Sequence, residues 1–398
     1  MGERLRETAA MDAAFHMGVY ARKPVMFVSG EGMRLTDDEG REYLDFVSGI
    51  GAVNLGHSHP AVVEAVREQI GRLTHVSNLF FVEHRDELAA DLVGLFGGEA
   101  KVFFCNSGAE ANEGAIKLAR RWGREKRGAA CHEIVTAERS FHGRTLATLA
   151  ATGQPSKQEA FAPLPAGFSH VPLNDIEALE AAVGPRTCAV MLEPVQGEGG
   201  VHPCDPAYLT AVRSLCDARD ILLVFDEVQT GLYRCGEPFA WQVYQVRPDI
   251  MCLAKSLANG LPAGAVVAHD EVASAFKPGD HGSTFGGGPV VCAAARACLS
   301  ALASEHLGEK AVATGEYLRE KLRDYARTTG VVADVRGVGC MNAVEFSDPI
   351  AAQVASAALE RGIVLNNIGA HILRVLPPLV CGVEEIDTLV ATLHELAS

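Results

Sequence analysis

The chain has 398 residues, of which 48% are hydrophobic and 21% are charged. This composition is typical of a folded globular protein and excludes a disordered one, and the length favours two or three domains. Lysine and arginine total 35 against 50 aspartates and glutamates, so the net charge is −15. A charge of this sign disfavours nucleic acids and anionic membranes as partners, while a local basic pocket for a small anion stays compatible with it.

The cysteines and the apolar runs indicate a cytoplasmic location. The 11 cysteines include no C-x-x-C motif and are odd in number, so we expect reduced thiols and no disulfide framework. The N-terminal residues lack the apolar core of a signal peptide. The longest apolar runs, such as residues 221–225, are far shorter than the roughly 20 residues that span a bilayer.

The predicted elements begin with a helix that Pro60 opens, with Val63, Val66, Ile70 and Leu73 on one face. The middle of the chain then alternates helical patterns with apolar runs at residues 102–105, 133–137, 189–192, 221–225, 250–253 and 265–268. These runs are continuous instead of alternating, which is typical of strands buried on both faces. We therefore expect an α/β domain with a mostly parallel sheet.

The pattern changes from Pro289 onward. An Ala-rich helix leads to a second helix at residues 315–327, and shorter strands follow within residues 331–345 and 363–378. This order predicts a smaller α+β domain. We assign residues 46–290 to the large domain, residues 291–398 to the small domain, and residues 1–45 to an N-terminal segment that packs with the small domain.

Residues able to do chemistry follow four of the predicted strands. Residues 106–110 enter a helix after the first run, Asp226 ends the most apolar run, Lys255 follows another, and residues 193–200 follow a fourth. Ligands of open α/β folds bind beyond the carboxyl ends of the strands. We therefore expect a helix N-terminus, two groups of carboxylates and one lysine to converge there.

Each of these residues allows two interpretations. Ser107 and Glu110 match a capping box, yet the same helix start with Gly108 would also bind a phosphate. Lys255 is either a lysine that reaches the surface or a nucleophilic amine that binds a carbonyl compound covalently. Asp226 is either a cap or salt-bridge residue or the partner of a cationic ring nitrogen. A reactive lysine and an acid at a ring nitrogen are together what pyridoxal phosphate requires of a protein.

Arg144 lies in a polar loop at residues 141–145. It is either a solvated charge or an arginine that binds a carboxylate through two hydrogen bonds. The second interpretation would give this acidic chain a site for an anionic substrate.

Other cofactor classes are disfavoured. His57 and His59 lack a third clustered ligand, so we expect a turn there and no metal site. Gly337 and Gly339 lack the third glycine of a nicotinamide-binding fingerprint. A phosphate-binding P-loop before Lys255 would need a glycine where the chain has Asp249.

A set of motifs in order along nearly the whole chain carries a family resemblance. They are residues 45–49, 56–60, 106–113, 141–145, 193–200, 225–231, 253–256, 284–287 and 373–378. Together they resemble the class III, ornithine-type pyridoxal-phosphate aminotransferases. The resemblance implies fold type I with a seven-stranded central sheet, pyridoxal 5'-phosphate as cofactor, and a homodimer with shared active sites.

The resemblance also implies roles by position. Lys255 would bind the cofactor covalently, and Asp226 would keep its pyridine nitrogen protonated. The other expected cofactor contacts are Ser107, Gly108, Ala109, Phe141, Glu227, Val228, Gln229 and, from the other subunit, Thr284.

For the substrate, the resemblance implies that Arg144 binds a carboxylate, with Ser283 of the partner chain nearby. Glu198 would cover Arg374 until a second carboxylate enters, and Tyr20 is a weaker contact candidate. The implied donor is the terminal amine of N²-acetylornithine and the acceptor is 2-oxoglutarate, as in arginine biosynthesis. Ornithine, succinylornithine, 4-aminobutyrate or N²-linked lysine donors, a glutamate-semialdehyde aminomutase, and a cofactor-binding regulator without turnover stay as alternatives.

The chain departs from the family pattern at Gly288, at residues 233–235 and at residues 256–259. None of these positions carries a catalytic group. We expect them around the mouth of the pocket, where they would affect the choice of substrate.

Overall fold

A computed structural model describes residues 2–397. A seven-stranded sheet forms its centre, with the strand order β4-β12-β11-β10-β7-β5-β6. The strands are β4 (Ala100–Cys105), β5 (Glu133–Ala137), β6 (Phe168–Val171), β7 (Thr187–Leu192), β10 (Leu222–Asp226), β11 (Ile250–Leu253) and β12 (Gly264–His269). Only β12 runs antiparallel to its neighbours in this sheet. The prediction of a mostly parallel, seven-stranded sheet is therefore confirmed.

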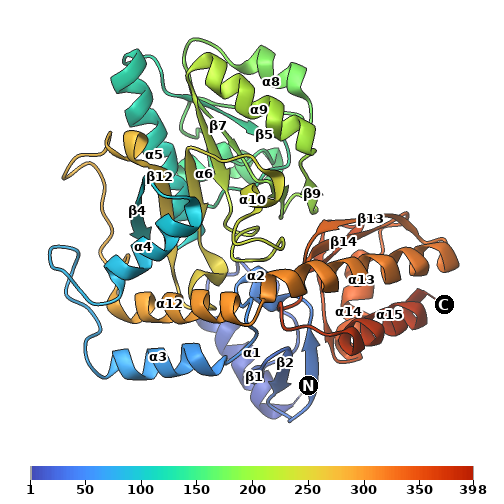
Figure 1. Ribbon diagram of the computed structural model, residues 1–398. Helices are drawn as coiled ribbons and strands as arrows, with labels where there is room; N and C mark the ends of the chain where they lie inside the picture. The colour runs from blue at the N-terminus through green and yellow to red at the C-terminus, as the bar shows by residue number, and fades with distance from the viewer. Residues whose placement is uncertain (1, 398) are drawn as a thin grey trace.

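Helices cover both faces of this sheet, which explains the continuous apolar runs (Figure 1). In β10, Leu222 and Val224 pack into the cluster under α5 (Gly108–Arg127). Leu223 and Phe225 point to the opposite face, where they pack with α8 (Ile176–Ala182) and α9 (Pro206–Arg219). Each strand residue is thus buried whichever way its side chain points.

Helix α5 begins directly after β4, and its position sets the site. The Ser107 side chain accepts a hydrogen bond from the Glu110 N–H at 3.2 Å and so caps the helix. Buried alanines at 111, 115 and 119 let the helix lie close to the sheet. Basic residues fill its last turn, where they interact favourably with the negative end of the helix dipole.

The N-terminal part leads into the central sheet. Its elements are α1 (Glu3–Phe15), β1 (Phe27–Glu31), β2 (Arg34–Asp37), β3 (Glu42–Asp45), α3 (Pro60–Ile70) and α4 (Arg85–Phe96). The helix that Pro60 opens is present, but its expected apolar face is partly wrong. Val62 and Gln69 are buried, whereas Ile70 is 55% exposed and Leu73 lies beyond the helix. The apolar residues at the end of α3 are therefore only partly covered by the rest of residues 2–397.

The C-terminal part forms a second layer beside the large sheet (Figure 1). Its elements are α12 (Pro289–Ser304), α13 (Leu307–Thr329), β13 (Val332–Val338), β14 (Met341–Phe346), α14 (Ala351–Glu360), β15 (Ile363–Val364), β16 (Asn366–Ile368), β17 (Ile372–Val375) and α15 (Val383–Ala397). Strands β13, β14, β17 and β16 form one antiparallel sheet, while β15 pairs with β3. Helix α12 packs on α3 and α4 instead of on this sheet. The domain bounds at 45 and 290 stay a prediction.

Short elements complete the fold. They are α2 (Ser48–Gly51), α6 (Leu146–Ala151), α7 (Pro155–Gln158), η1 (Glu159–Phe161), β8 (Val195–Gln196), β9 (His202–Pro203), α10 (Ala240–Tyr244), η2 (Lys255–Ala258) and α11 (Asp270–Ala273). Within residues 2–397 no single helix is both long and apolar enough to cross a bilayer; α12 and α13 reach that threshold only together, across a 65° bend.

Candidate active site

A cavity of about 420 Å³ opens at the carboxyl edge of the central sheet. The residues of the sequence-predicted site that line it are Ser107, Gly108, Ala109, Phe141, Arg144, Glu198, Asp226, Val228, Gln229 and Lys255. They follow β4, β5, β7, β10 and β11, whose carboxyl ends meet there because the five strands are parallel. The convergence that the strand order predicts is therefore present.

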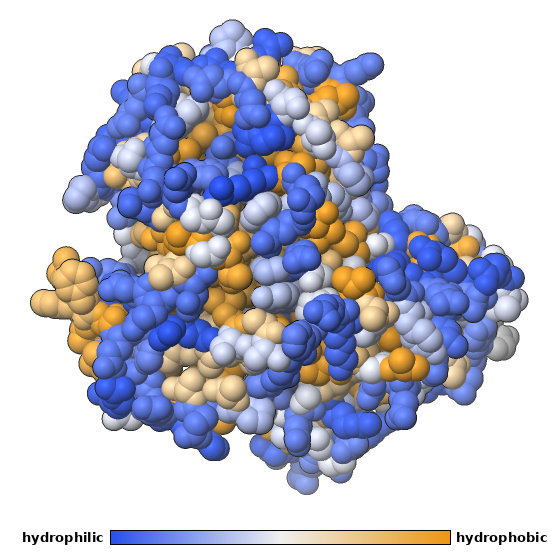
Figure 2. Space-filling view, in the orientation of Figure 1, coloured by the Kyte–Doolittle hydropathy of each residue, from blue (hydrophilic) through white to orange (hydrophobic). Residues whose placement is uncertain are grey.

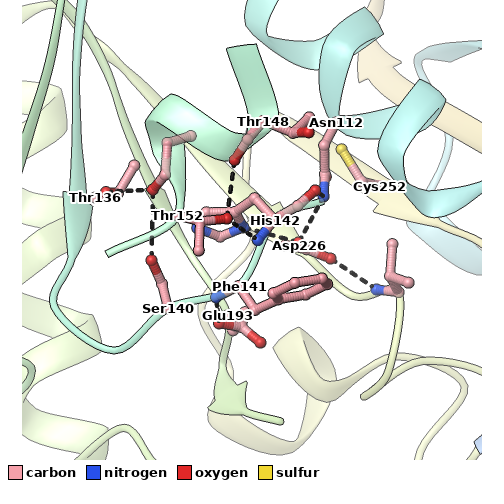
Figure 3. Close-up of polar contacts among 12 residues, drawn as sticks. Asn112, Thr136, Ser140, Phe141, His142, Thr148, Thr152, Glu193, Asp226 and Cys252 are labelled. Carbon is pink, nitrogen blue, oxygen red and sulfur yellow. Dashed lines mark hydrogen bonds and ion pairs between the residues drawn. The ribbon is translucent and has the colours of Figure 1, made fainter. Parts of the chain in front are cut away.

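Asp226 is the last residue of β10, and its carboxylate is held from three directions (Figure 3). Its Oδ2 accepts hydrogen bonds from Asn112 Nδ2 at 2.7 Å and from His142 Nδ1 at 2.8 Å. Its Oδ1 accepts one from the Val228 N–H at 3.0 Å. These three hydrogen bonds fix the position of the carboxylate at the wall of the cavity.

His142 and Glu193 also line the cavity, next to Asp226 and Phe141 (Figure 3). Burial opposes the charged form of His142, but the hydrogen bond to Asp226 and its negative charge outweigh burial and raise the pKa of His142. Burial also raises the pKa of Glu193 to about 7. The Glu193 carboxylate accepts hydrogen bonds from the Phe141 and Gly197 N–H groups, both at 3.0 Å, and so fixes the backbone that carries Phe141.

Lys255 is the second residue after the end of β11. Its backbone φ of 45° lies in the left-handed region, which residues with side chains rarely adopt and which is found preferentially at functional sites. Burial lowers the pKa of Lys255 to about 8, although the nearby Glu198 carboxylate opposes this. The amine is therefore more often neutral, and so more nucleophilic, than an ordinary lysine at the same pH.

The start of α5 forms a compact wall at one end of the cavity. A Cβ built on Gly108 would lie 2.8 Å from a methyl group of Val228, so no other residue fits there without a shift. The carboxylate of Glu110 reaches back to the N–H of Asn106 at 2.7 Å instead of to Ser107. Ser107 thus caps the helix, and the cavity lies in front of the first N–H groups of α5. Free N–H groups at a helix start favour a bound anion.

Two arginines also belong to the site. Arg144 is exposed at the cavity and lies over the Phe141 ring, with the guanidinium carbon 5.5 Å from the ring centroid. Arg374 is buried and forms an ion pair with Glu198, and it donates a hydrogen bond to Asn366 Oδ1 at 2.6 Å. Arg374 keeps the pKa of Glu198 below its usual value even though burial raises it. Glu198 thus separates Arg374 from the cavity.

The structure does not bring every predicted residue to this cavity. Tyr20 is 74% exposed in the segment after α1, against Arg22. Glu227 is buried away from the cavity, where it accepts hydrogen bonds from the Ala240 and Trp241 N–H groups at 2.7 and 2.8 Å and holds the start of α10. Ser283 and Thr284 line a separate hollow. Their expected role toward a partner chain stays a prediction.

The departures from the family pattern do not line the cavity, although residues 256–259 lie between Lys255 and Gly260, which do. Their expected position around its mouth stays a prediction. Asn259 binds the Leu55 N–H and the Gly56 carbonyl, both at 3.0 Å, and so ties residues 256–259 to the N-terminal part. Gly288 is the N-cap of α12. Arg234 is fully buried and contacts backbone on the C-terminal side of the fold.

Sequence reasoning missed the supporting residues Asn112, His142 and Glu193. Each lies inside a motif, but the pairing of His142 with Asp226 spans 84 positions and no local pattern reveals it. The two histidines of the 56–60 motif bind different carboxylates, His57 to Asp45 at 2.8 Å and His59 to Glu305 at 3.0 Å.

Comparison with known proteins agrees with this site. The profile of the family Aminotransferase class-III matches residues 18–396. An acetylornithine aminotransferase of Caldanaerobacter subterraneus is 49% identical over 383 residues, which are 96% of this chain and 97% of the relative. One of Methanocaldococcus jannaschii is 46% identical, over 97% of this chain and 96% of the relative. The chain belongs to the class-III aminotransferases.

A solved structure supports the same assignment. The ornithine aminotransferase of Toxoplasma gondii, described with partial occupancy of pyridoxal phosphate at its active site, superposes with a TM-score of 0.94 at 34% identity. The match covers 98% of this chain and 94% of that protein. The fold-type-I architecture that the resemblance implies is therefore confirmed.

Proposed function

We propose that this protein transfers the terminal amino group of N²-acetylornithine to 2-oxoglutarate, with pyridoxal phosphate as its cofactor. The products would be N-acetylglutamate 5-semialdehyde and glutamate, as in arginine biosynthesis. The observation that carries the proposal is the convergence of Lys255, Asp226 and Arg144 on one cavity. The identity of 49% to an acetylornithine aminotransferase supports this choice of donor.

The residues that line the cavity carry the chemical groups that the cofactor requires. The α5 start, where Gly108 leaves no room for a side chain, suits a phosphate. The Asp226 carboxylate, held by Asn112 and His142, suits a protonated ring nitrogen. Lys255, with its lowered pKa, suits a carbonyl carbon. Phe141 and Val228 supply apolar surfaces for a flat ring between these groups.

The residues of the chain divide the chemistry among them. When bound, pyridoxal phosphate supplies an electron sink for the electron pair left on the substrate carbon. Asp226 keeps the ring nitrogen protonated, while Asn112 and His142 hold the carboxylate in place. Lys255 Nζ accepts the proton from the terminal carbon of the donor and donates it again on the cofactor side. The semialdehyde leaves before 2-oxoglutarate enters.

The arginines serve the carboxylates of the two substrates. Arg144 binds the carboxylate that lies far from the reacting carbon, through paired hydrogen bonds. Arg374 stays covered by Glu198 while the donor is bound, because the terminal amine of the donor brings no carboxylate to this end. The second carboxylate of 2-oxoglutarate then displaces Glu198. The ion pair between Glu198 and Arg374 supports this exchange.

The active unit would be a homodimer. Leu79, Phe80 and Phe81 are 85%, 62% and 95% exposed in the loop between α3 and α4, and Phe285 is 65% exposed. Figure 2 shows an apolar protrusion where Figure 1 draws this loop. Side chains of this kind are normally covered. A partner chain that covers them would also bring Ser283 and Thr284 toward a second active site.

The cytoplasm would be the place of the reaction. All eleven cysteines lie in the described part of the chain, and each is a buried free thiol. A chain with this many unpaired thiols is typical of a reducing compartment.

A steady-state assay tests the proposed donor. Purified protein with pyridoxal phosphate and 2-oxoglutarate is offered N²-acetylornithine, ornithine, succinylornithine, 4-aminobutyrate and N²-acetyllysine in turn, and glutamate is measured. We expect the highest kcat/KM with N²-acetylornithine. A higher kcat/KM with another donor would identify that donor as the substrate instead. No turnover with any of the donors would favour a binding protein without activity.

A further inference from the structure

Lys157 lies close to the ring of Phe141, which lines the cavity. It belongs to the short helix α7, which follows the loop that carries Phe141 and Arg144. Its Nζ lies 5.9 Å from the centroid of the Phe141 ring, and the Arg144 guanidinium carbon lies 5.5 Å from the same centroid. Two cationic side chains thus meet on one aromatic ring that lines the cavity.

These two cations lack a carboxylate of their own. The only polar contact of Lys157 among the described residues is the side-chain oxygen of Gln154, which is neutral. Arg144 forms no ion pair within residues 2–397. The acid whose charge acts on Lys157 is Glu198, and the buried Arg374 already pairs with it. Two neighbouring positive charges without an acid are unfavourable unless an anion joins them.

The electrostatic environment agrees with a shared anion. Burial and then the positive charge of Arg144 lower the pKa of Lys157, while Glu198 partly opposes them. A carboxylate bound between the two side chains would remove this repulsion. In a chain of net charge −15, such a local pair of cations also attracts small anions that the rest of the surface repels.

We infer that Lys157 and Arg144 together form the binding site for the far carboxylate of both substrates, which makes Lys157 a specificity-determining residue. The inference rests on the proposed function. The donor presents its α-carboxylate and 2-oxoglutarate its γ-carboxylate, and in each case that group lies several bonds from the reacting carbon. Lys157 binds this group as a point charge beside the flat, two-pronged Arg144. The contact does not change during the reaction, so it affects substrate binding more than the chemical step.

The test compares Lys157→Gln, Lys157→Arg and Lys101→Gln in the holoenzyme. Lys101 lies on β4, pairs with Asp270 and is 67% exposed, so its variant changes the net charge by the same amount away from the site. Two quantities are measured: KM and kcat for both substrates, and the dissociation constant of glutarate by titration calorimetry. Glutarate has two carboxylates and no keto group, so its binding reports on the site without turnover.

We expect Lys157→Gln to raise both KM values and the glutarate dissociation constant about tenfold, with kcat changed by less than about twofold. Lys157→Arg should restore the values to within about threefold, and Lys101→Gln should match the wild type. Unchanged KM values and glutarate binding in Lys157→Gln would overturn the inference. An equal loss in Lys101→Gln would also overturn it, because general charge would then explain the effect. A wild type inactive toward N²-acetylornithine would instead refute the proposed donor.

Discussion

At the scale of single residues, the position of the reactive groups follows from the strands that precede them. Asp226 and Lys255 could be predicted because each follows a run of buried apolar residues at the edge where ligands bind. The interactions that hold these two residues in place could not be predicted from the sequence. Lys255 has a left-handed backbone conformation that no local pattern indicates. The two side chains that bind Asp226 come from segments far from it in the chain.

The lowered pKa of Lys255 predicts that this residue destabilises the apo-protein. At pH 7 its amine is charged in both the folded and the unfolded chain, and the folded chain bears the cost of burial. Lys255→Met should therefore abolish turnover yet raise the free energy of unfolding by about 2–3 kcal/mol at pH 7. The wild type should gain stability between pH 8 and about 10.5, because its unfolded chain then binds more protons, so the difference should shrink there.

Urea unfolding of both apo-proteins at pH 7 and pH 10 measures this difference. A variant that is less stable than the wild type at pH 7 would contradict the burial of a reactive amine.

The network around Asp226 predicts a loss of rate with little loss of cofactor. Asp226→Ala removes the negative charge at the ring nitrogen while Lys255 and the α5 start remain. We expect kcat to fall on the order of 100-fold or more, with the cofactor still bound in the visible absorption spectrum. Asp205→Ala, at an exposed helix cap, is the matched control. A kcat for Asp226→Ala equal to that of the control would show that Asp226 is not the residue that holds the ring nitrogen of the cofactor protonated.

At the scale of elements, Arg234, the unchanged residue of the altered motif at residues 233–235, holds distant segments together. Arg234 is fully buried and donates hydrogen bonds to the Cys340 carbonyl at 3.1 Å, to Ser48 Oγ at 3.2 Å and to the Pro377 carbonyl. These partners belong to the N-terminal and C-terminal parts of the chain. The sequence identifies Arg234 only as part of an altered motif, because its partners lie more than 100 positions away.

Arg234→Met should therefore destabilise the fold more than it harms the chemistry. The methionine would leave several buried acceptors without a donor, so we expect a loss of about 3 kcal/mol or more in the free energy of unfolding. Arg361→Met, whose side chain is 42% exposed, should change it by less than about 0.5 kcal/mol. Urea titration of both variants gives the two values. A loss no larger in Arg234→Met than in Arg361→Met would refute the linking role.

At the scale of the whole molecule, the apolar loop between α3 and α4 and the end of α3 stay largely exposed among residues 2–397. Periodicity places Ile70 on an apolar face and predicts burial, but it cannot tell a face that packs inside the chain from one that packs against a second copy. The mostly parallel sheet and the cavity at its carboxyl edge could be predicted because both depend on continuous apolar runs and on the residues that follow them, which are local features of the sequence. The placement of α12 on α3 and α4 could not, because it depends on distant packing.

The proposed homodimer predicts that charges in this loop separate the subunits. Leu79→Asp combined with Phe81→Asp should convert a dimer into a monomer at micromolar concentration and reduce activity, because Ser283 and Thr284 would no longer reach a neighbouring site. Val383→Asp, at another exposed apolar position, should leave the dimer intact. Light scattering after gel filtration measures the mass. A double variant of unchanged mass would contradict this interface.

The central claim is that Lys255 and its surroundings carry out the first half of an amino transfer from an acylated ornithine. The most direct measurement is the visible absorption spectrum of the purified holoenzyme, before and after N²-acetylornithine is added without any keto acid. We expect the yellow absorption band of the bound cofactor to be lost with N²-acetylornithine and to return when 2-oxoglutarate is added. A yellow protein whose spectrum ignores N²-acetylornithine would contradict the proposed donor, and a protein that shows no band with pyridoxal phosphate would contradict the site itself.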